Sequence, residues 1–143
     1  SSAASDVYKR QPGELNLEDY GIKNQNINTI SLISPTTKKD RVESIAKNST
    51  GFVYYVTLRG VTGASNLDVN EINANIEEIK KHAQVPTLAG FGIKSSEDAK
   101  LLSEYADGVI IGSSIVQMIE ENSNSKEFDR IGKYITEIKQ AIS

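Results

Sequence analysis

Residues 109–119 read Val-Ile-Ile-Gly-Ser-Ser-Ile-Val-Gln-Met-Ile, and this stretch decides the fold. A short apolar run typical of a buried strand passes directly through Gly112-Ser113 into an amphipathic helix. The same change from a β-rich run to a helical period occurs four times after Glu14, with strands expected at 29–34, 52–58, 86–89 and 107–111. This alternation predicts an α/β fold, a parallel sheet with helices packed outside it. The sheet could close as a barrel or lie flat and doubly wound.

Helix starts and buried helix faces can also be predicted. Thr37-Lys-Lys-Asp40 and Ser95-Ser-Glu-Asp98 have the form of a capping box, so each is expected to begin a helix. Apolar residues at three- and four-residue spacing predict one buried stripe on each of two helices. The stripes are Ile72, Ile76, Ile79 and Ala83, and Phe128, Ile131, Ile135, Ile138 and Ile142.

Length and composition fit one globular domain. The chain has 143 residues, 38% of them hydrophobic, and a net charge of -3. It has no apolar run near the roughly 18 to 20 residues of a membrane span, and residues 1–11 lack the apolar core of a secretory signal, so a cytoplasmic setting is expected. Residues 1–13 are small and polar and end in Pro12-Gly13, which predicts a non-native leader before a domain at 14–143.

The residue types present limit the kinds of metal and redox site that the chain can form. The chain has no cysteine and one histidine, His82, which excludes disulfides and thiolate zinc sites and leaves no histidine-rich metal site. No metal or cofactor is therefore expected. A sequence pI of about 5.2 and the lack of a basic stripe with aromatics argue against nucleic-acid binding.

Three glycine-bearing loops each follow an expected strand. They are Gly60-Val-Thr-Gly63, Gly90-Phe-Gly92 and Gly112-Ser113-Ser114. Glycine lets the backbone approach a ligand and point its N–H groups inward, and a following helix adds the positive end of its dipole. One such loop would be read as an ordinary turn, but three in series predict a phosphate site. Ser113 could donate a hydroxyl hydrogen bond there or serve as a helix N-cap.

These loops carry a resemblance to a known family. Tyr54 with Gly60-Val-Thr-Gly-Ala64, Gly90-Phe-Gly-Ile93 and Gly112-Ser-Ser-Ile-Val116 together resemble the α subunit of tryptophan synthase, over about residues 17–143. The resemblance implies a (β/α)₈ barrel of the TIM type, which cleaves indole-3-glycerol phosphate to indole and glyceraldehyde 3-phosphate in tryptophan biosynthesis. Such a barrel needs about 250 residues, so this chain is expected to be its C-terminal half, with strands five to eight.

The resemblance also implies site residues. It places Gly63, Gly92, Gly112 and Ser113 at the substrate phosphate. It places Tyr54, Thr62, Ile33, Phe91 and Ile110 in the substrate pocket, although Tyr54, Ile33, Phe91 and Ile110 could equally be barrel core. Arg59 departs from the family pattern and is expected in solvent.

No catalytic residue is expected in this chain. The family reaction needs a glutamate and an aspartate near the second strand, in the half that the chain lacks, so the isolated chain is predicted to be inactive. The remaining acids are expected on solvated surfaces: Asp68, Glu71, Glu77, Glu78, Glu97 and Asp98. Asp107 is expected at the end of its strand opposite the glycine loops.

Partners follow from the same resemblance. Pro35-Thr36 matches a family loop that docks the β subunit, which would carry the pyridoxal phosphate. Inner apolar residues such as Ile33, Val53 and Ile110 would lose their opposing layer, so the fragment is expected to self-associate. Two alternatives stay open, a non-catalytic phosphate-binding half-barrel and another phosphate-binding barrel enzyme, such as a phosphoribosyl isomerase or a thiamine-phosphate synthase.

Overall fold

The computed structural model describes residues 28–57, 69–90, 92–121 and 128–143. The predicted leader at 1–13 lies outside these residues. Four strands, β1 (Ser31–Ile33), β2 (Val53–Val56), β3 (Thr87–Gly90) and β4 (Gly108–Val109), form one sheet in chain order. All three neighbouring pairs are parallel. The four predicted strands are therefore confirmed, with ends that differ from the expected ones by one or two residues.

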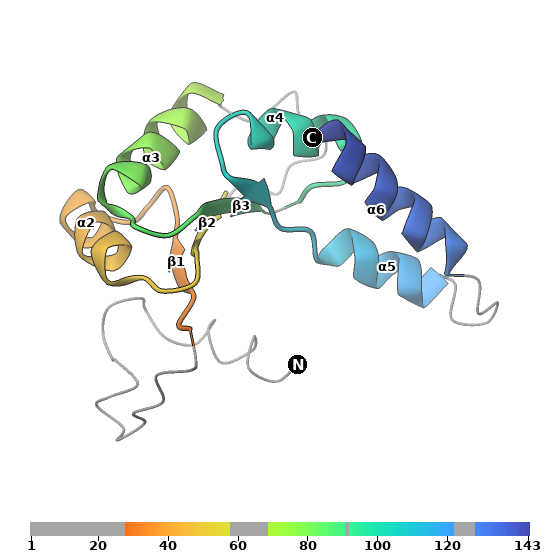
Figure 1. Ribbon diagram of the computed structural model, residues 1–143, viewed down its shortest axis with the longest axis horizontal. Helices are drawn as coiled ribbons and strands as arrows, with labels where there is room; N and C mark the ends of the chain where they lie inside the picture. Colours follow the sequence, from red (N-terminus) through yellow and green to blue (C-terminus); the bar gives the residue numbers. More distant parts are fainter. Residues whose placement is uncertain (1–27, 58–68, 91, 122–127) are drawn as a thin grey trace, which may run out of the picture.

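Helices follow the strands as the alternation predicts. They are α2 (Lys39–Asn48) after β1, α3 (Val69–His82) after β2, α4 (Ser96–Ser103) after β3, and α5 (Ser113–Glu121) and α6 (Asp129–Ala141) after β4. Figure 1 shows α2, α3, α4 and α6 as an arc around the sheet. Four parallel β/α units in this arrangement are half of a (β/α)₈ barrel.

The two faces of the sheet have different environments. Val53 and Tyr55 are fully buried on the face covered by helices. The Tyr55 hydroxyl accepts a hydrogen bond of 3.0 Å from the Asn75 side chain of α3, and burial raises the pKa of Tyr55, so the phenol is neutral. Because side chains alternate along a strand, Tyr54 lies on the opposite face.

The strand register corrects one expectation about the inner face. Leu32 pairs with Tyr54, and Ile33 pairs with Tyr55, so Ile33 lies on the helix-covered face. Ile33 is 2% exposed, and Val53 is fully buried. The prediction that these two side chains lose their opposing layer in a half-barrel is wrong, because the helices of this same chain cover them. Fifteen of the described residues form this core: Ile33, Val42, Ile45, Ala46, Val53, Tyr55, Ile72, Ile76, Ile79, Ala89, Ile93, Ala99, Leu102, Ala106 and Ile138.

Only one of the two predicted capping boxes forms. The Ser95 hydroxyl accepts from the Asp98 amide at 3.1 Å, and the Asp98 carboxylate accepts from the Ser95 amide at 3.2 Å. Asp98 is 8% exposed, so the expectation that it is solvated is wrong. Thr37 does not cap α2, because its hydroxyl accepts from the Ser34 amide at 3.0 Å in the turn after β1, and Lys38 takes the N-cap position.

The last two helices are covered less than their patterns predict. The stripe of α3 is confirmed, with Ile72, Ile76 and Ile79 buried, but α6 buries only Ile138. None of the nine residues of α5 is buried. Large apolar side chains are left exposed here: Val116 (53%), Ile119 (45%), Phe128 (60%) and Ile135 (49%), which together we name the α5–α6 face. Within the described residues no strand follows β4, and none of these residues supplies a sheet that covers the four exposed side chains.

Asp107 joins β3 and α3 at the amino end of the sheet. Its carboxylate accepts from the Thr87 amide at the start of β3, at 2.8 Å, and pairs with the Lys80 ammonium of α3, at 2.9 Å. Partial burial raises the pKa of Asp107, but the Thr87 hydrogen bond and Lys80 outweigh it, and the pKa lies below its ordinary value. The prediction that Asp107 lies at the opposite end of its strand from the glycine loops is confirmed for the Gly92 loop and the start of α5.

We expect Asp107→Asn to lower the free energy of unfolding by about 1 kcal/mol at neutral pH, a modest value because the pair is partly exposed. The carboxylate has a lowered pKa in the folded chain, so its stabilisation is full above the unfolded pKa and is lost as the pH falls through the folded one. Urea unfolding of both proteins from neutral pH to about pH 3 should show the difference shrinking toward acid. Glu137→Gln on the exposed side of α6 is the control, and an equal, pH-dependent loss there would contradict the prediction.

Candidate functional site

The loop after β3 turns sharply at a glycine. β3 ends at Gly90, and Gly92 has a φ of +68°, a left-handed conformation that favours glycine. Ile93 follows and is 3% exposed, so the loop is anchored in the core immediately after the turn. Asp98 then accepts from the amides of Lys94, at 3.1 Å, and of Ser95, which fastens the loop to α4. The backbone around Gly92 is thus held in place on its C-terminal side.

Gly112 and Ser113 form the start of α5. The Gly112 carbonyl accepts from the amides of Ile115 and Val116, both at 3.0 Å, so Gly112 is the N-cap residue. Ser113 is the first helical residue and is exposed, so its interpretation as an N-cap is wrong. The first amides of a helix have no acceptor within the helix and lie at the positive end of its dipole, which suits an anion.

A hydrogen bond joins these two segments. The Ser114 hydroxyl donates to the Ile93 carbonyl at 2.7 Å, across 21 positions of sequence. The loop after β3 and the start of α5, two of the three predicted phosphate loops, therefore lie together at the carboxyl end of the sheet. The sequence alone does not predict this hydrogen bond of Ser114. The sequence feature that points to it is the adjacent pair Ser113-Ser114.

Close packing shapes the sheet face beside these loops. A Cβ added to Gly90 would lie 2.5 Å from the Ile110 carbonyl oxygen and 2.9 Å from its Cβ, so only glycine fits. Gly90 lies two residues after Leu88, which pairs with Tyr54, so Tyr54, Leu88, Gly90 and Ile110 share the face opposite the helices. Tyr54 and Ile110 are both half-buried there.

The other predicted residues divide into two groups. Ile33 lies on the helix-covered face, away from Tyr54, which favours its interpretation as barrel core. Gly63, Thr62 and Phe91 fall outside the described residues, as do Arg59 and Asp68. The structure thus brings Gly92, Gly112 and Ser113 together at the carboxyl end of the sheet. Tyr54 and Ile110 lie on the adjoining sheet face, opposite the helices.

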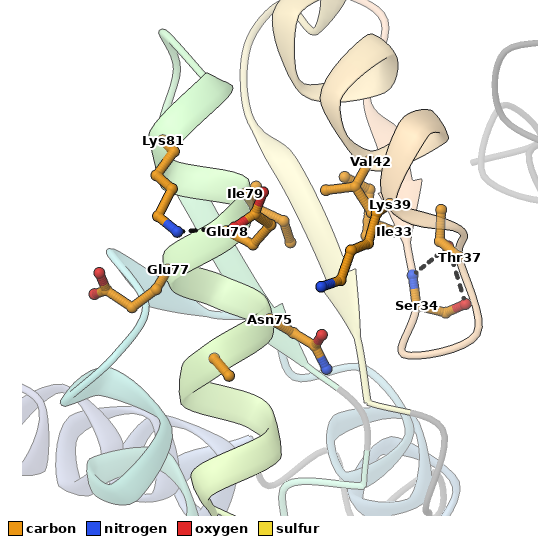
Figure 2. A pocket seen from close by; sticks show the side chains of 11 residues that line it. Ile33, Ser34, Thr37, Lys39, Val42, Asn75, Glu77, Glu78, Ile79 and Lys81 are labelled. Atoms are coloured by element: carbon orange, nitrogen blue, oxygen red, sulfur yellow. Dashed lines mark hydrogen bonds and ion pairs between the residues drawn. The ribbon is translucent and has the colours of Figure 1, made fainter.

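A cavity of about 350 Å³ lies elsewhere, between α2, α3 and the turn after β1 (Figure 2). Its lining includes Ile33, Ser34 and Asn75, and Glu78 pairs with Lys81 on its rim at 2.9 Å. The hydrogen bond from Lys81 holds the pKa of Glu78 below its ordinary value, so this carboxylate is ionised near neutral pH and is no proton donor. None of the residues that line the cavity belongs to the Gly92 loop or to the start of α5.

Two classes of site are not found in the described parts of the chain. Among these residues, no group of three or more His, Asp or Glu side chains could hold a metal ion. No helix in the same ranges is long and apolar enough to cross a membrane.

The fold and these loops define the class as a parallel β/α protein of the barrel type, with its candidate site at the carboxyl ends of the strands. A family model described as tryptophan synthase alpha chain matches residues 13–143. The chain belongs to the tryptophan synthase alpha chain family.

Individual relatives agree with this assignment. The chain is 42% identical over 121 residues to the tryptophan synthase alpha chain of Neisseria meningitidis serogroup B, covering 85% of this chain and 46% of that relative. The crystal structure of the alpha subunit from Legionella pneumophila superposes with a TM-score of 0.74 at 30% identity, covering 92% of this chain and 48% of that one. The alpha subunit from Campylobacter jejuni gives 0.71 at 36% identity, covering 88% and 51%. The chain thus spans about half the length of the relatives it matches, as predicted.

Proposed function

We propose that this chain supplies the phosphate- and indole-binding half of a tryptophan synthase α subunit. The complete subunit would cleave indole-3-glycerol phosphate to indole and glyceraldehyde 3-phosphate, in the cytoplasm, and would pass indole to a β subunit that carries pyridoxal phosphate. The observation that carries the proposal is the meeting of the Gly92 loop with the Gly112-Ser113 helix start, joined by the Ser114 hydrogen bond. Barrels of the (β/α)₈ type frequently bind phosphate at the loops after their last two strands, which agrees with that placement.

Each residue has a role in this proposal. The backbone amides near Gly92, Gly112 and Ser113 would donate to the phosphate oxygens, with Gly63 completing the set, and the Ser113 hydroxyl would add a further donor. Tyr54 and Ile110, on the face opposite the helices, would contact the indole, together with Thr62 and Phe91. Hydrogen bonds to a charged acceptor contribute about 1.5 to 3 kcal/mol each, so a few of them would give micromolar to millimolar affinity.

The isolated chain is proposed to bind phosphate without catalysing cleavage. The acid and base that the reaction needs are expected in the half of the barrel that this chain does not contain. Purified chain incubated with indole-3-glycerol phosphate should release no indole above the buffer rate. Release at an enzyme-like rate would refute the proposed inactivity.

Phosphate binding is tested by titrating the chain with inorganic phosphate and glycerol 3-phosphate while following backbone amide NMR signals. We expect shifts at Gly92, Gly112 and Ser113, and about tenfold weaker binding in Gly112→Ala, because the added methyl occupies space near the amides. A Cβ at Gly112 meets no atom within 4 Å, so this variant should fold. Gly132→Ala in α6, where a Cβ is equally free, is the matched control. Equal binding by both variants would remove Gly112 from the site.

Self-association is a second part of the proposal. The α5–α6 face exposes four large apolar side chains, and no strand pairs with the outer edge of β1 or β4 among the described residues. Apolar patches and unpaired edges of this kind favour association between chains. We propose that the chain by itself forms dimers or larger species through this face.

A further inference from the structure

Ser113 and Ser114 are adjacent, but their hydroxyls have different environments. Ser113 is exposed at the first position of α5, whereas the Ser114 hydroxyl is half-buried and donates to the Ile93 carbonyl at 2.7 Å. The bond spans 21 positions of sequence, so it joins two separate segments and does not form a turn. A short, partly buried hydrogen bond of this kind restricts the separation of the groups that it joins.

Both ends of this bond are attached to rigid structure. Ile93 is buried in the core, and the capping box of Ser95 and Asp98 fastens the next residues to α4. Ser114 belongs to the first turn of α5, which is closed by the Gly112 carbonyl. Because each end is held by contacts within its own segment, the bond sets the position of one segment relative to the other.

The bonded residues stand immediately beside the residues proposed to hold phosphate. Gly92 precedes Ile93, and Ser113 precedes Ser114. Donors that already have the correct separation bind an anion without a further ordering cost, so fixing this separation should raise affinity. The Ser114 hydroxyl is occupied by Ile93, and its effect on a ligand would therefore be indirect.

We propose that Ser114 is a positioning residue, which ties the loop after β3 to the start of α5 and so holds the two sets of backbone donors at the separation that a phosphate group requires. This inference rests on the proposed phosphate site. Its structural part, the tie itself, can be measured without any ligand.

The test uses the pair Ser114→Thr and Ser114→Val, whose new side chains have nearly the same shape and differ in the hydroxyl, together with Ser114→Ala. Inorganic phosphate affinity is measured by NMR titration, and hydrogen exchange of residues 92–95 is measured without ligand. We expect the valine and alanine variants to bind phosphate about fivefold more weakly and to exchange faster, with threonine close to wild type. Ser103→Ala is the matched control, because the Ser103 hydroxyl donates to the Lys100 carbonyl at the same 2.7 Å within α4.

The outcomes separate the two proposals. Unchanged affinity and exchange in folded Ser114→Val would overturn the positioning role, and so would an equal effect of Ser103→Ala. If the wild-type chain binds no phosphate, the proposed function fails, and exchange alone decides whether Ser114 ties the segments. Loss of folded protein in both the alanine and the valine variant also counts against the proposal, since the hydroxyl would then serve folding and not placement.

Discussion

Gly90→Val should prevent the chain from folding, and Gly90→Ala should lower the free energy of unfolding by about 3 kcal/mol or more. The first side-chain carbon would lie 2.5 Å from the Ile110 carbonyl oxygen, which is backbone and cannot rotate away. Moving that strand end would break the hydrogen bond of 2.9 Å from the Ile110 amide to the Ala89 carbonyl. For Gly90→Val, the expected loss in the free energy of unfolding approaches the total stability of a small domain, roughly 5 to 15 kcal/mol.

Far-ultraviolet circular dichroism and urea unfolding of the Gly90 variants would measure this loss. Gly112→Ala is the control in the neighbouring loop, where an added Cβ meets no atom within 4 Å. It should cost at most about 1 kcal/mol, the difference between glycine and alanine at an N-cap. A folded Gly90→Val protein with wild-type stability would show that β3 and the end of β4 are farther apart than described.

The second large effect concerns the α5–α6 face. If the chain self-associates through this face, the double variant Val116→Lys, Ile135→Lys should sediment as a monomer while the wild-type chain forms larger species. Burying a large aliphatic side chain contributes about 1.5 to 3 kcal/mol, and a lysine in its place would oppose contact by its charge and hydration. The expected weakening of association is therefore at least a hundredfold.

Sedimentation velocity over a range of chain concentrations measures this effect. Thr136→Lys is the matched control, because Thr136 is exposed on α6 next to Ile135 but does not belong to the apolar stripe. It adds one positive charge and should leave association unchanged. A monomeric wild-type chain, or a Thr136 variant that dissociates as readily as the double variant, would contradict the proposed self-association.

The order and type of the elements could be predicted because the signals for them are local. Each strand is a short apolar run, and the stripe of α3 repeats at helical spacing and is buried as expected. The stripe of α6 has the same spacing, yet Phe128 and Ile135 are exposed. Periodicity indicates which side chains share a face, but burial also depends on an opposing surface, and the described residues do not supply one to Phe128 and Ile135.

The faces of the sheet were harder to predict than its strands. Parallel strands are apolar on both sides, so alternation alone cannot tell which side meets the helices. The family resemblance places both Ile33 and Tyr54 in the pocket, and only the register separates them. Thr37 shows a similar limit, because the hydroxyl of a capping motif can instead bond to a nearby turn amide, here that of Ser34.

The fastening of β3 by Asp107 has a consequence for how sequences of this kind can change. Asp107, Thr87 and Lys80 lie at the amino ends of the strands, while Gly92, Gly112 and Ser114 lie at the carboxyl ends. A substitution at the first end alters acid tolerance without touching the second, and the reverse also holds, since effects of distant sites add independently. Substitutions at Asp107 can therefore change the acid tolerance of the chain while the arrangement of Gly92, Gly112 and Ser114 is kept.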